Sequence, residues 1–384
     1  MQYPNSITSK LPNVGTTIFT VMSKMAADYG AINLSQGFPD FDGDKHLIDL
    51  VGKHMNSGRN QYAPMEGYIC LREQLAIKTE EMYSASYNPE TEVTITAGAT
   101  QALYSAISAV IREDDEVIIF EPAYDSYVSA IELNGGKAIH MQLIAPHYSI
   151  DWELVKKAIN RRTKMIIINT PHNPTGSMMS SADMEQLIKI TDGTDIIVLS
   201  DEVYEHIVFD GYEHQSVARF PKLAERSFIV SSFGKTYHTT GWKMGYCVAP
   251  ENLMKEFRKV HQFQVFCVNA PIQYALADFI DRKEHYLELG AFYQQKRDYF
   301  INLLQGSKFE LLPSSGTYFQ LLNYKNISDE KDTEFATKLT KENGVASIPV
   351  SVFYQQKNDL KVLRFCFAKK EETLQQAVEI LHKL

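Results

Sequence analysis

Short apolar runs alternate with helix-length amphipathic stretches through the middle of the chain. Six runs rich in β-branched and aliphatic residues predict buried strands, at residues 93–96, 117–120, 165–168, 196–199, 228–230 and 246–248. Stretches with helical periodicity, such as 101–111 and 182–190, lie between some of these runs. The alternation predicts an α/β fold in which helices cover both faces of a mainly parallel sheet.

The two ends of the chain have a different pattern. Residues 291–304 and 333–342 predict longer helices, and residues 317–322 and 362–367 predict short strands of a second, smaller α/β domain. Glycines and prolines recur in the first ~40 residues, which indicates an arm that crosses to that smaller domain. We therefore expect an N-terminal arm and part of the small domain over 1–45, a large domain over 46–285, and a small C-terminal domain over 286–384.

Composition narrows the classes of partner. The 384 residues are 44% hydrophobic and 22% charged, as in ordinary globular proteins. A net charge of -9 disfavours a nucleic acid, which requires a basic face, so small molecules are the expected partners. The four cysteines form no C-x-x-C pair, which predicts neither a metal site nor disulfides and favours the cytoplasm. We expect no signal peptide and no membrane contact, because no apolar run reaches the ~20 residues that a bilayer requires.

Polar motifs gather where the predicted strands end, and α/β sheets bind ligands at the carboxyl ends of their strands. Lys235 follows one strand in the sequence SSFGKT, and Lys243 lies in a glycine-flanked turn before the next. Two nearby cations repel each other unless an anion separates them. A phosphate beside Lys243 would leave Lys235 with a lowered pKa, as a nucleophilic amine. A lone lysine after a strand is more often a solvated charge.

Two further strand ends carry similar signals. The sequence TAGATQ at 96–101 closes a strand and opens a helix, where free backbone amides form a seat for phosphate. A tight turn alone would explain its glycine equally well. Asn173 lies in the sequence NTPHNPTG at 169–176, whose two prolines hold the loop rigid. The alternative for this asparagine is an ordinary Asx turn.

Two charged residues are predicted to be buried. Asp201 is separated by one residue from a run of four aliphatic residues that ends at Leu199, and a buried carboxylate needs a cationic partner such as a protonated ring nitrogen. A helix N-cap is the alternative. Arg364 lies inside a hydrophobic strand, where its planar fork suits a carboxylate, although a structural ion pair is also plausible.

Together these motifs resemble the fold-type-I pyridoxal-phosphate-dependent aminotransferases of class I/II. The likeness is strongest to the branch that holds the bacterial methionine aminotransferases and the kynurenine aminotransferase/glutamine transaminase K enzymes. It is carried most clearly by residues 33–41, 231–246 and 348–354. The resemblance implies a large domain with a mainly parallel seven-stranded sheet flanked by helices, together with a smaller α/β domain.

The resemblance also implies a role for each motif. Lys235 would bond to the aldehyde of pyridoxal 5'-phosphate, and Asp201 would pair with the ring nitrogen. The remaining cofactor contacts would come from Gly98, Ala99, Thr100, Tyr124, Asn173, Tyr204, Ser232 and Lys243, with Tyr62 reaching the phosphate of a neighbouring subunit in a homodimer with shared active sites. The substrate would be bound by Arg364, Asn173 and Gly37 at its carboxylate and by Phe19 and Phe353 at its side chain.

One departure from the family bears on the substrate. Near Val268 and Asn269 the kynurenine-type enzymes carry aromatic and imidazole groups that this chain lacks. We therefore expect ping-pong transamination between methionine and a 2-oxo acid, with aromatic amino acids or glutamine as further donors. The alternatives are a kynurenine- or glutamine-type aminotransferase, a cysteine-conjugate β-lyase on the same fold, and a non-enzymatic cofactor-binding sensor. The last is disfavoured by the combination of Lys235, Asp201 and Arg364.

Overall fold

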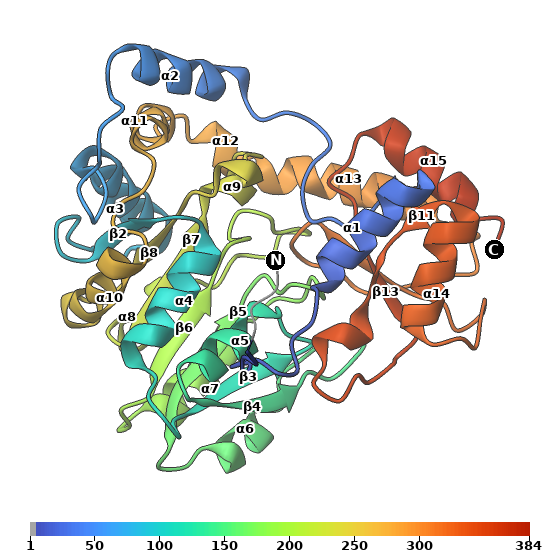
Figure 1. The fold of residues 1–384 in the computed structure, drawn as a ribbon, viewed down its shortest axis with the longest axis horizontal. Helices are drawn as coiled ribbons and strands as arrows, with labels where there is room; N and C mark the ends of the chain where they lie inside the picture. Colours follow the sequence, from blue (N-terminus) through green and yellow to red (C-terminus); the bar gives the residue numbers. More distant parts are fainter. Residues whose placement is uncertain (1–4) are drawn as a thin grey trace.

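A seven-stranded sheet in the order β2-β8-β7-β6-β5-β3-β4 forms the centre of the computed structural model, which describes residues 5–384 (Figure 1). β8 runs antiparallel to both of its neighbours, β2 and β7, and every other pair of neighbouring strands is parallel. The mainly parallel seven-stranded sheet is therefore confirmed. Its strands are β2 (Val93–Thr96), β3 (Glu116–Glu121), β4 (Lys137–Gln142), β5 (Thr163–Asn169), β6 (Ile197–Asp201), β7 (Ser227–Ser232) and β8 (Gly245–Val248).

Alternate side chains of the buried strands pack on opposite faces of the sheet. Val117 and Ile119 of β3 join one hydrophobic cluster, whereas Ile118 and Phe120 join the other. One face is covered by α4 (Ala99–Val110), α5 (Ser126–Leu133) and α10 (Glu251–Gln264). The other is covered by α3 (Ile69–Tyr83), α6 (Trp152–Ala158), α7 (Ser181–Thr191) and α8 (Pro221–Ala224). Helices on both faces confirm the predicted layers.

The sequence pattern did not reveal β4. Both ends of this edge strand, Lys137 and Gln142, are exposed, and its four central residues are only partly buried. An edge strand has one neighbour and more contact with water, so it lacks the continuous apolar run that identifies a buried parallel strand.

The second sheet is antiparallel and lies toward the C-terminus, in the order β12-β13-β10-β9. Its strands are β9 (Glu310–Leu311), β10 (Phe319–Asn323), β12 (Ile348–Pro349) and β13 (Val362–Cys366). Around it lie α13 (Leu289–Leu303), α14 (Asp332–Lys338) and α15 (Glu371–Leu381), which lie at the right of Figure 1. The helix predicted over 333–342 departs from α geometry in its last part, because Leu339–Asn343 forms a π-helical turn that ends at Gly344.

The N-terminal segment crosses to this second sheet region. Helix α1 (Ile18–Tyr29) contacts β11 (Val345–Ala346), and β1 (Ile32–Asn33) pairs with β11 in parallel. By contrast, α2 (Lys45–Asn56) packs against α11 (Ala270–Phe279), beside the large sheet. These contacts support the domain boundaries near residues 45 and 285, which stay a prediction; residues 1–4 of the arm lie outside the described part of the chain.

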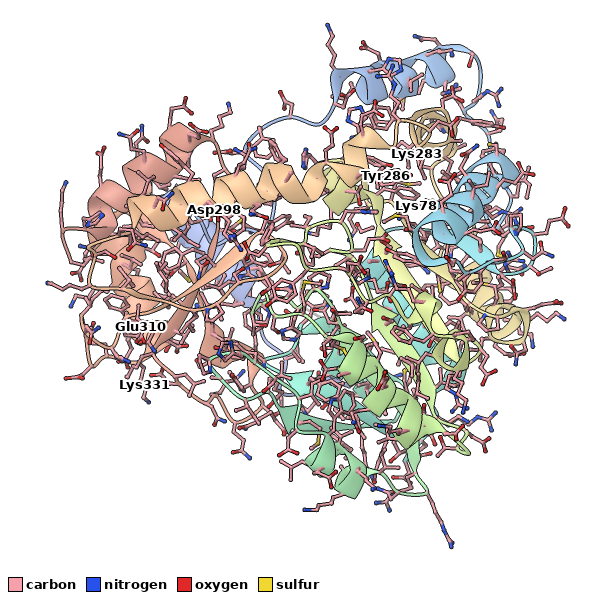
Figure 2. The ribbon with its side chains drawn as sticks, turned by 180° about the vertical axis from the view of Figure 1, so that it is seen from behind. Lys78, Lys283, Tyr286, Asp298, Glu310 and Lys331 are labelled. Carbon is pink, nitrogen blue, oxygen red and sulfur yellow. The ribbon has the colours of Figure 1, made fainter. Side chains whose placement is uncertain are left out.

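A buried ion pair holds the loop after β6 in place. The Nζ atom of Lys78, on α3, lies 2.8 Å from Oε1 of Glu205, and both side chains are almost fully buried. Figure 2 labels Lys78 close to Tyr286 of α12 (Glu284–Leu287), and its Nζ lies 5.7 Å from that ring. Although burial opposes ionisation, Lys78 keeps the pKa of Glu205 well below its usual value. The charged network therefore fixes the backbone next to Tyr204.

Candidate active site

A cavity of about 210 Å³ opens where β2, β5, β6 and β7 end. The fold brings to it residues from five separate stretches of the chain. Every predicted cofactor-binding residue except Tyr62 lines it: Gly98, Ala99, Thr100, Tyr124, Asn173, Asp201, Tyr204, Ser232, Lys235 and Lys243.

Lys235 lies in the single-turn helix α9 (Phe233–Thr236), directly after β7. Its Nζ donates hydrogen bonds to the Gly37 carbonyl at 3.0 Å and to the Tyr318 hydroxyl at 2.8 Å. Burial lowers the pKa of Lys235 to about 8, and the neighbouring cations Arg364 and Lys243 act in the same direction. The predicted lowering of this pKa is thus present, but burial rather than Lys243 is its main cause.

Asp201 closes β6 and is 4% exposed. Its Oδ2 accepts a hydrogen bond from the Tyr127 hydroxyl at 2.6 Å, and its Oδ1 accepts one from the Val203 backbone at 3.3 Å. Burial raises the pKa of Asp201 to about 6. The two hydrogen bonds lower this pKa, but they offset only part of the effect of burial. Since both partners are uncharged, a cation that entered the cavity would find a buried carboxylate to pair with.

The turn between β2 and α4 has the features of an anion-binding site. Gly98 has a φ of +80°, and α4 begins after it without a side-chain cap, so its first backbone amides are free to bind a ligand. A Cβ atom at position 98 would lie 3.5 Å from Nζ of Lys243. The ammonium group of Lys243 therefore lies close to the first residues of α4.

Arg364 lies on β13 at the border of the cavity, next to its lining residue Asn173, and is 1% exposed. Its guanidinium donates to Oδ1 of Asn173 at 2.8 Å and to the Ser35 carbonyl at 3.0 Å, and its Nε has no hydrogen-bond partner. Burial lowers the pKa of Arg364 to about 10, so the group stays charged at neutral pH. The guanidinium carbon lies 5.3, 3.9 and 5.7 Å from the ring centroids of Phe19, Phe319 and Phe353.

Two predicted residues have surroundings that the sequence did not indicate. Tyr62 is 80% exposed and lies outside the cavity of its own chain, with its ring edge-on to Phe266 at 5.3 Å. Gly37 presents its carbonyl to Lys235, and a Cβ atom there would lie 2.8 Å from the ring of Phe319. A side chain at position 37 would therefore collide with that ring.

Sequence reasoning missed several residues that complete the site. Asn169 donates to the Asp201 carbonyl at 2.9 Å and accepts from the Asn173 backbone at 2.8 Å, so it joins two strand ends. Tyr127 lies three residues after Tyr124, and Tyr318 immediately precedes β10. Tyr318 lies within the strand predicted over 317–322, and a tyrosine in such a segment is equally typical of core packing.

A larger cavity of about 440 Å³ lies on the other side of Asn169, and Tyr148, His172 and Asp183 are among its lining residues. We assign the chemistry to the smaller cavity, because Lys235 and Asp201 line that one. Buried ionisable groups with shifted pKa values that face one cavity are typical of active sites.

The sequence model of the aminotransferase class I and II family matches residues 29–381. The chain belongs to this family. The aminotransferase is 52% identical over 377 residues to the methionine aminotransferase of Escherichia coli strain K12, which covers 98% of both chains. It is 32% identical to the human kynurenine–oxoglutarate transaminase 1 over 94% of both chains.

Solved structures agree with the sequence relatives. A crystal structure of a methionine aminotransferase from Escherichia coli matches the aminotransferase with a TM-score of 0.97 and 51% identity, covering 99% of this chain and 100% of that one. An aspartate aminotransferase from Thermus thermophilus matches with a TM-score of 0.90 and 27% identity, covering 99% of both. The fold is therefore that of the fold-type-I aminotransferases.

Proposed function

We propose that the protein catalyses pyridoxal-phosphate-dependent transamination, with methionine as its preferred amino donor and a 2-oxo acid as acceptor, by a ping-pong mechanism. The observation that carries this proposal is the convergence of Lys235, Asp201 and Lys243 on one cavity, with Arg364 bonded to Asn173 at its border. The similarity to the Escherichia coli methionine aminotransferase supports the choice of donor.

The residues of the cavity fit the cofactor at each end. Buried Asp201, with uncharged partners, suits a protonated ring nitrogen, and Lys243 with the uncapped start of α4 suits a phosphate. Ser232 and Thr100 would add hydroxyl donors to the phosphate, Tyr124 would lie on the ring face, and Asn173 and Tyr204 would bind the phenolic oxygen. When bound, pyridoxal phosphate supplies the electron sink that makes the α-proton of an amino acid acidic.

Lys235 performs the proton transfer in this proposal. Burial lowers its pKa to about 8, which places the amine near neutrality, where it can accept and return a proton. With pyridoxal phosphate and substrate bound, the free Lys235 amine would accept the substrate α-proton, hold it and return it. Arg364 holds the substrate carboxylate during this transfer and so fixes the direction of the α-hydrogen.

The side-chain pocket favours an apolar donor. Phe19 and Phe353 lie beside Arg364, with their ring centroids 5.9 Å apart, and offer a surface of carbon atoms to a thioether. One altered pocket wall changes preference by only ~1 to 3 kcal/mol, so aromatic donors and glutamine would be slower rather than excluded. β-Elimination from cysteine conjugates begins with the same deprotonation and would release pyruvate and ammonia.

The decisive experiment is a visible spectrum of the purified protein with methionine and without any oxo acid. We expect the absorption band of the lysine-bound cofactor to be replaced by that of its amino form, and an added 2-oxo acid to restore it. A bound cofactor that methionine leaves unchanged, while kynurenine or glutamine converts it, would refute the donor assignment. Failure to bind the cofactor after reconstitution would refute the whole proposal.

We further propose a cytoplasmic homodimer with shared active sites. All four cysteines are free thiols, which suits a reducing compartment. Tyr62, Phe263 and Phe266 are 80%, 88% and 51% exposed, and such aromatic side chains are typical of a surface that another subunit covers. In that assembly Tyr62 would reach the phosphate of the neighbouring cavity.

The substitution Phe263→Glu tests the dimer. A buried, unpaired carboxylate disfavours association, so we expect a shift toward monomer in sedimentation velocity and at least ~10-fold weaker cofactor binding. Glu256→Gln, on the same helix but paired with Lys259 on the surface, is the matched control and should change neither quantity. A Phe263→Glu protein that stays dimeric with full cofactor affinity would contradict this interface.

A further inference from the structure

Tyr318 is the closest side-chain partner of the Lys235 amine. The Nζ atom of Lys235 lies 2.8 Å from the Tyr318 hydroxyl and 3.0 Å from the Gly37 carbonyl, and the Tyr318 hydroxyl itself donates to that carbonyl. These three groups form a closed triangle of hydrogen bonds. None of the roles given above to the cofactor-binding residues includes Tyr318.

The polarity of the triangle is determined by the groups that form it. A carbonyl can only accept, and the single O–H of Tyr318 points at Gly37, so the tyrosine oxygen can only accept from Lys235, through a lone pair. Burial raises the pKa of Tyr318 well above its usual value, so the phenol keeps its proton throughout the neutral range. Tyr318 therefore accepts a hydrogen bond from the lysine without exchanging a proton with it.

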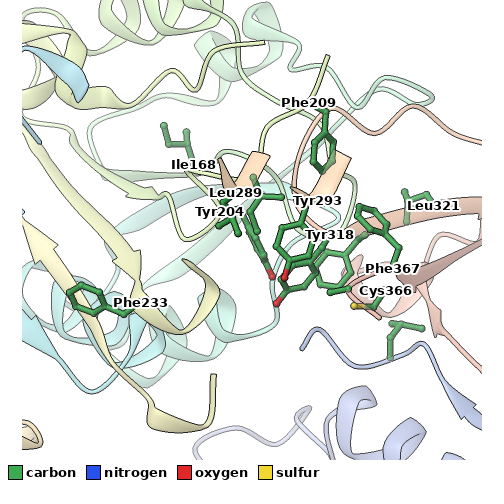
Figure 3. Packing of buried hydrophobic residues seen from close by; sticks show 14 of the residues in the cluster. Ile168, Tyr204, Phe209, Phe233, Leu289, Tyr293, Tyr318, Leu321, Cys366 and Phe367 are labelled. Carbon is green, nitrogen blue, oxygen red and sulfur yellow. The ribbon is translucent and has the colours of Figure 1, made fainter. Parts of the chain in front are cut away.

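The ring of Tyr318 is held from several sides. It is fully buried, and its centroid lies 5.2 Å from that of Tyr204 and 5.6 Å from that of Tyr293 (Figure 3). The preceding residue, Thr317, has a φ of +65°, which is strained for a β-branched residue, and its backbone amide is bonded to Ile207 at 2.9 Å. The strained residue thus directly precedes the tyrosine whose hydroxyl contacts Lys235.

We propose that Tyr318 and the Gly37 carbonyl form the seat that receives the Lys235 amine whenever the lysine is released from the cofactor. This inference rests on the proposed role of Lys235. In the seat, Lys235 would take the substrate α-proton and become an ammonium group, which both oxygens would stabilise, and it would then give the same proton up again. Lys235 ends as the neutral amine, and Tyr318 neither gains nor loses a proton.

The chain offers a matched pair of variants. Tyr318→Phe removes the hydroxyl that faces Lys235 and keeps the ring that packs on Tyr204. Tyr293→Phe removes the hydroxyl of a neighbouring, equally buried tyrosine, and that hydroxyl has no hydrogen-bond partner. Tyr293→Phe therefore measures what the loss of a buried phenol oxygen beside the site does by itself, whereas a seat for the lysine would affect Tyr318→Phe alone.

The first readout uses the cofactor-free protein. Competitive acetylation of Lys235 across pH, followed by mass spectrometry, measures the pKa of its amine in each variant. Tyr318→Phe loses an oxygen that accepts a hydrogen bond from the ammonium form, so the pKa of Lys235 should be lower than in the wild type. In Tyr293→Phe this pKa should equal the wild-type value. Equal values in all three proteins would overturn the proposal.

The second readout is the methionine half-reaction with α-protonated and α-deuterated substrate. We expect kcat of Tyr318→Phe to fall about 10-fold, with KM changed less than about 3-fold and a larger deuterium isotope effect, because proton transfer becomes slower. A loss confined to KM, or an equal loss in Tyr293→Phe, would overturn the proposal.

Borohydride reduction of the wild-type protein separates this inference from the function on which it rests. The reduction fixes the cofactor to its lysine, and peptide mapping identifies the residue. A cofactor fixed to another lysine would overturn the proposed function and the Tyr318 seat together. A cofactor fixed to Lys235, with Tyr318→Phe behaving as wild type, would overturn the seat alone.

Discussion

Replacing Lys235 by methionine is expected to lower kcat by at least about 10,000-fold, because the variant loses the group that bonds to the cofactor and moves the α-proton. The visible band of the lysine-bound cofactor should disappear with it. Single-turnover absorbance measurements with methionine check both effects. The control Lys255→Met removes an exposed lysine paired with Glu251 and should retain full activity.

The same substitution should make the cofactor-free protein more stable. Burial lowers the pKa of Lys235 from 10.5 to about 8 in the folded chain, so the unfolded chain binds more protons between these pH values. The cost of burying the ammonium group is complete below pH 8 and vanishes above about pH 10.5. At ~1.4 kcal/mol per pKa unit, methionine should add about 3 kcal/mol to the free energy of unfolding at pH 7.

Urea unfolding of both cofactor-free proteins at pH 7 and at about pH 10.5 measures this difference. The gain should be present at the lower pH and absent at the higher one. An inactive variant that is also less stable at pH 7 would indicate that Lys235 has a structural role, and would count against the assignment.

Replacing Arg364 by leucine is expected to lower kcat/KM for methionine by at least about 100-fold. A buried carboxylate held by charge-assisted hydrogen bonds accounts for ~3 kcal/mol, and leucine offers none of these bonds. The loss should appear mainly in KM. Because the guanidinium is bonded to oxygens of Asn173 and Ser35 rather than to a carboxylate, its removal leaves no protein carboxylate unpaired there.

Methioninol, which lacks the carboxylate, supplies the discriminating measurement. Wild-type protein should have a much higher kcat/KM for methionine than for methioninol. In Arg364→Leu the ratio of the two kcat/KM values should fall to nearly one. Arg364→Lys keeps the charge but not the planar fork, so an intermediate loss is expected. An unchanged ratio in Arg364→Leu would exclude Arg364 as the carboxylate ligand.

The large sheet was largely predictable from the sequence. Six of its strands are buried on both faces, so their β-branched runs stand out from the surrounding helices. Edge strand β4 was not predictable in the same way, because Lys137, His140 and Gln142 give it the composition of a surface segment. The sequence also did not predict that β8 is antiparallel. A short run of buried residues has the same composition in a parallel and in an antiparallel strand.

The site was predictable where its chemistry lies next to a strand end. Lys235 and Asn173 follow buried strands and Asp201 ends one, and the topology brings the ends of parallel strands to one edge. Contacts between distant segments could not be derived in this way. The carbonyl of Gly37 carries no side-chain signal, and Tyr318 resembles any core tyrosine until the fold brings both to Lys235.

The parallel pairing of β1 with β11 links the order of synthesis to the onset of activity. Residues 18–37 are synthesised more than 300 residues before their partners at 345–346 and Arg364. Contacts between such distant segments form late in folding. When synthesis has passed Lys235, Arg364 does not yet exist. The Gly37 carbonyl has not yet reached its final position either. The enzyme becomes competent only after both of these segments have been synthesised and have met.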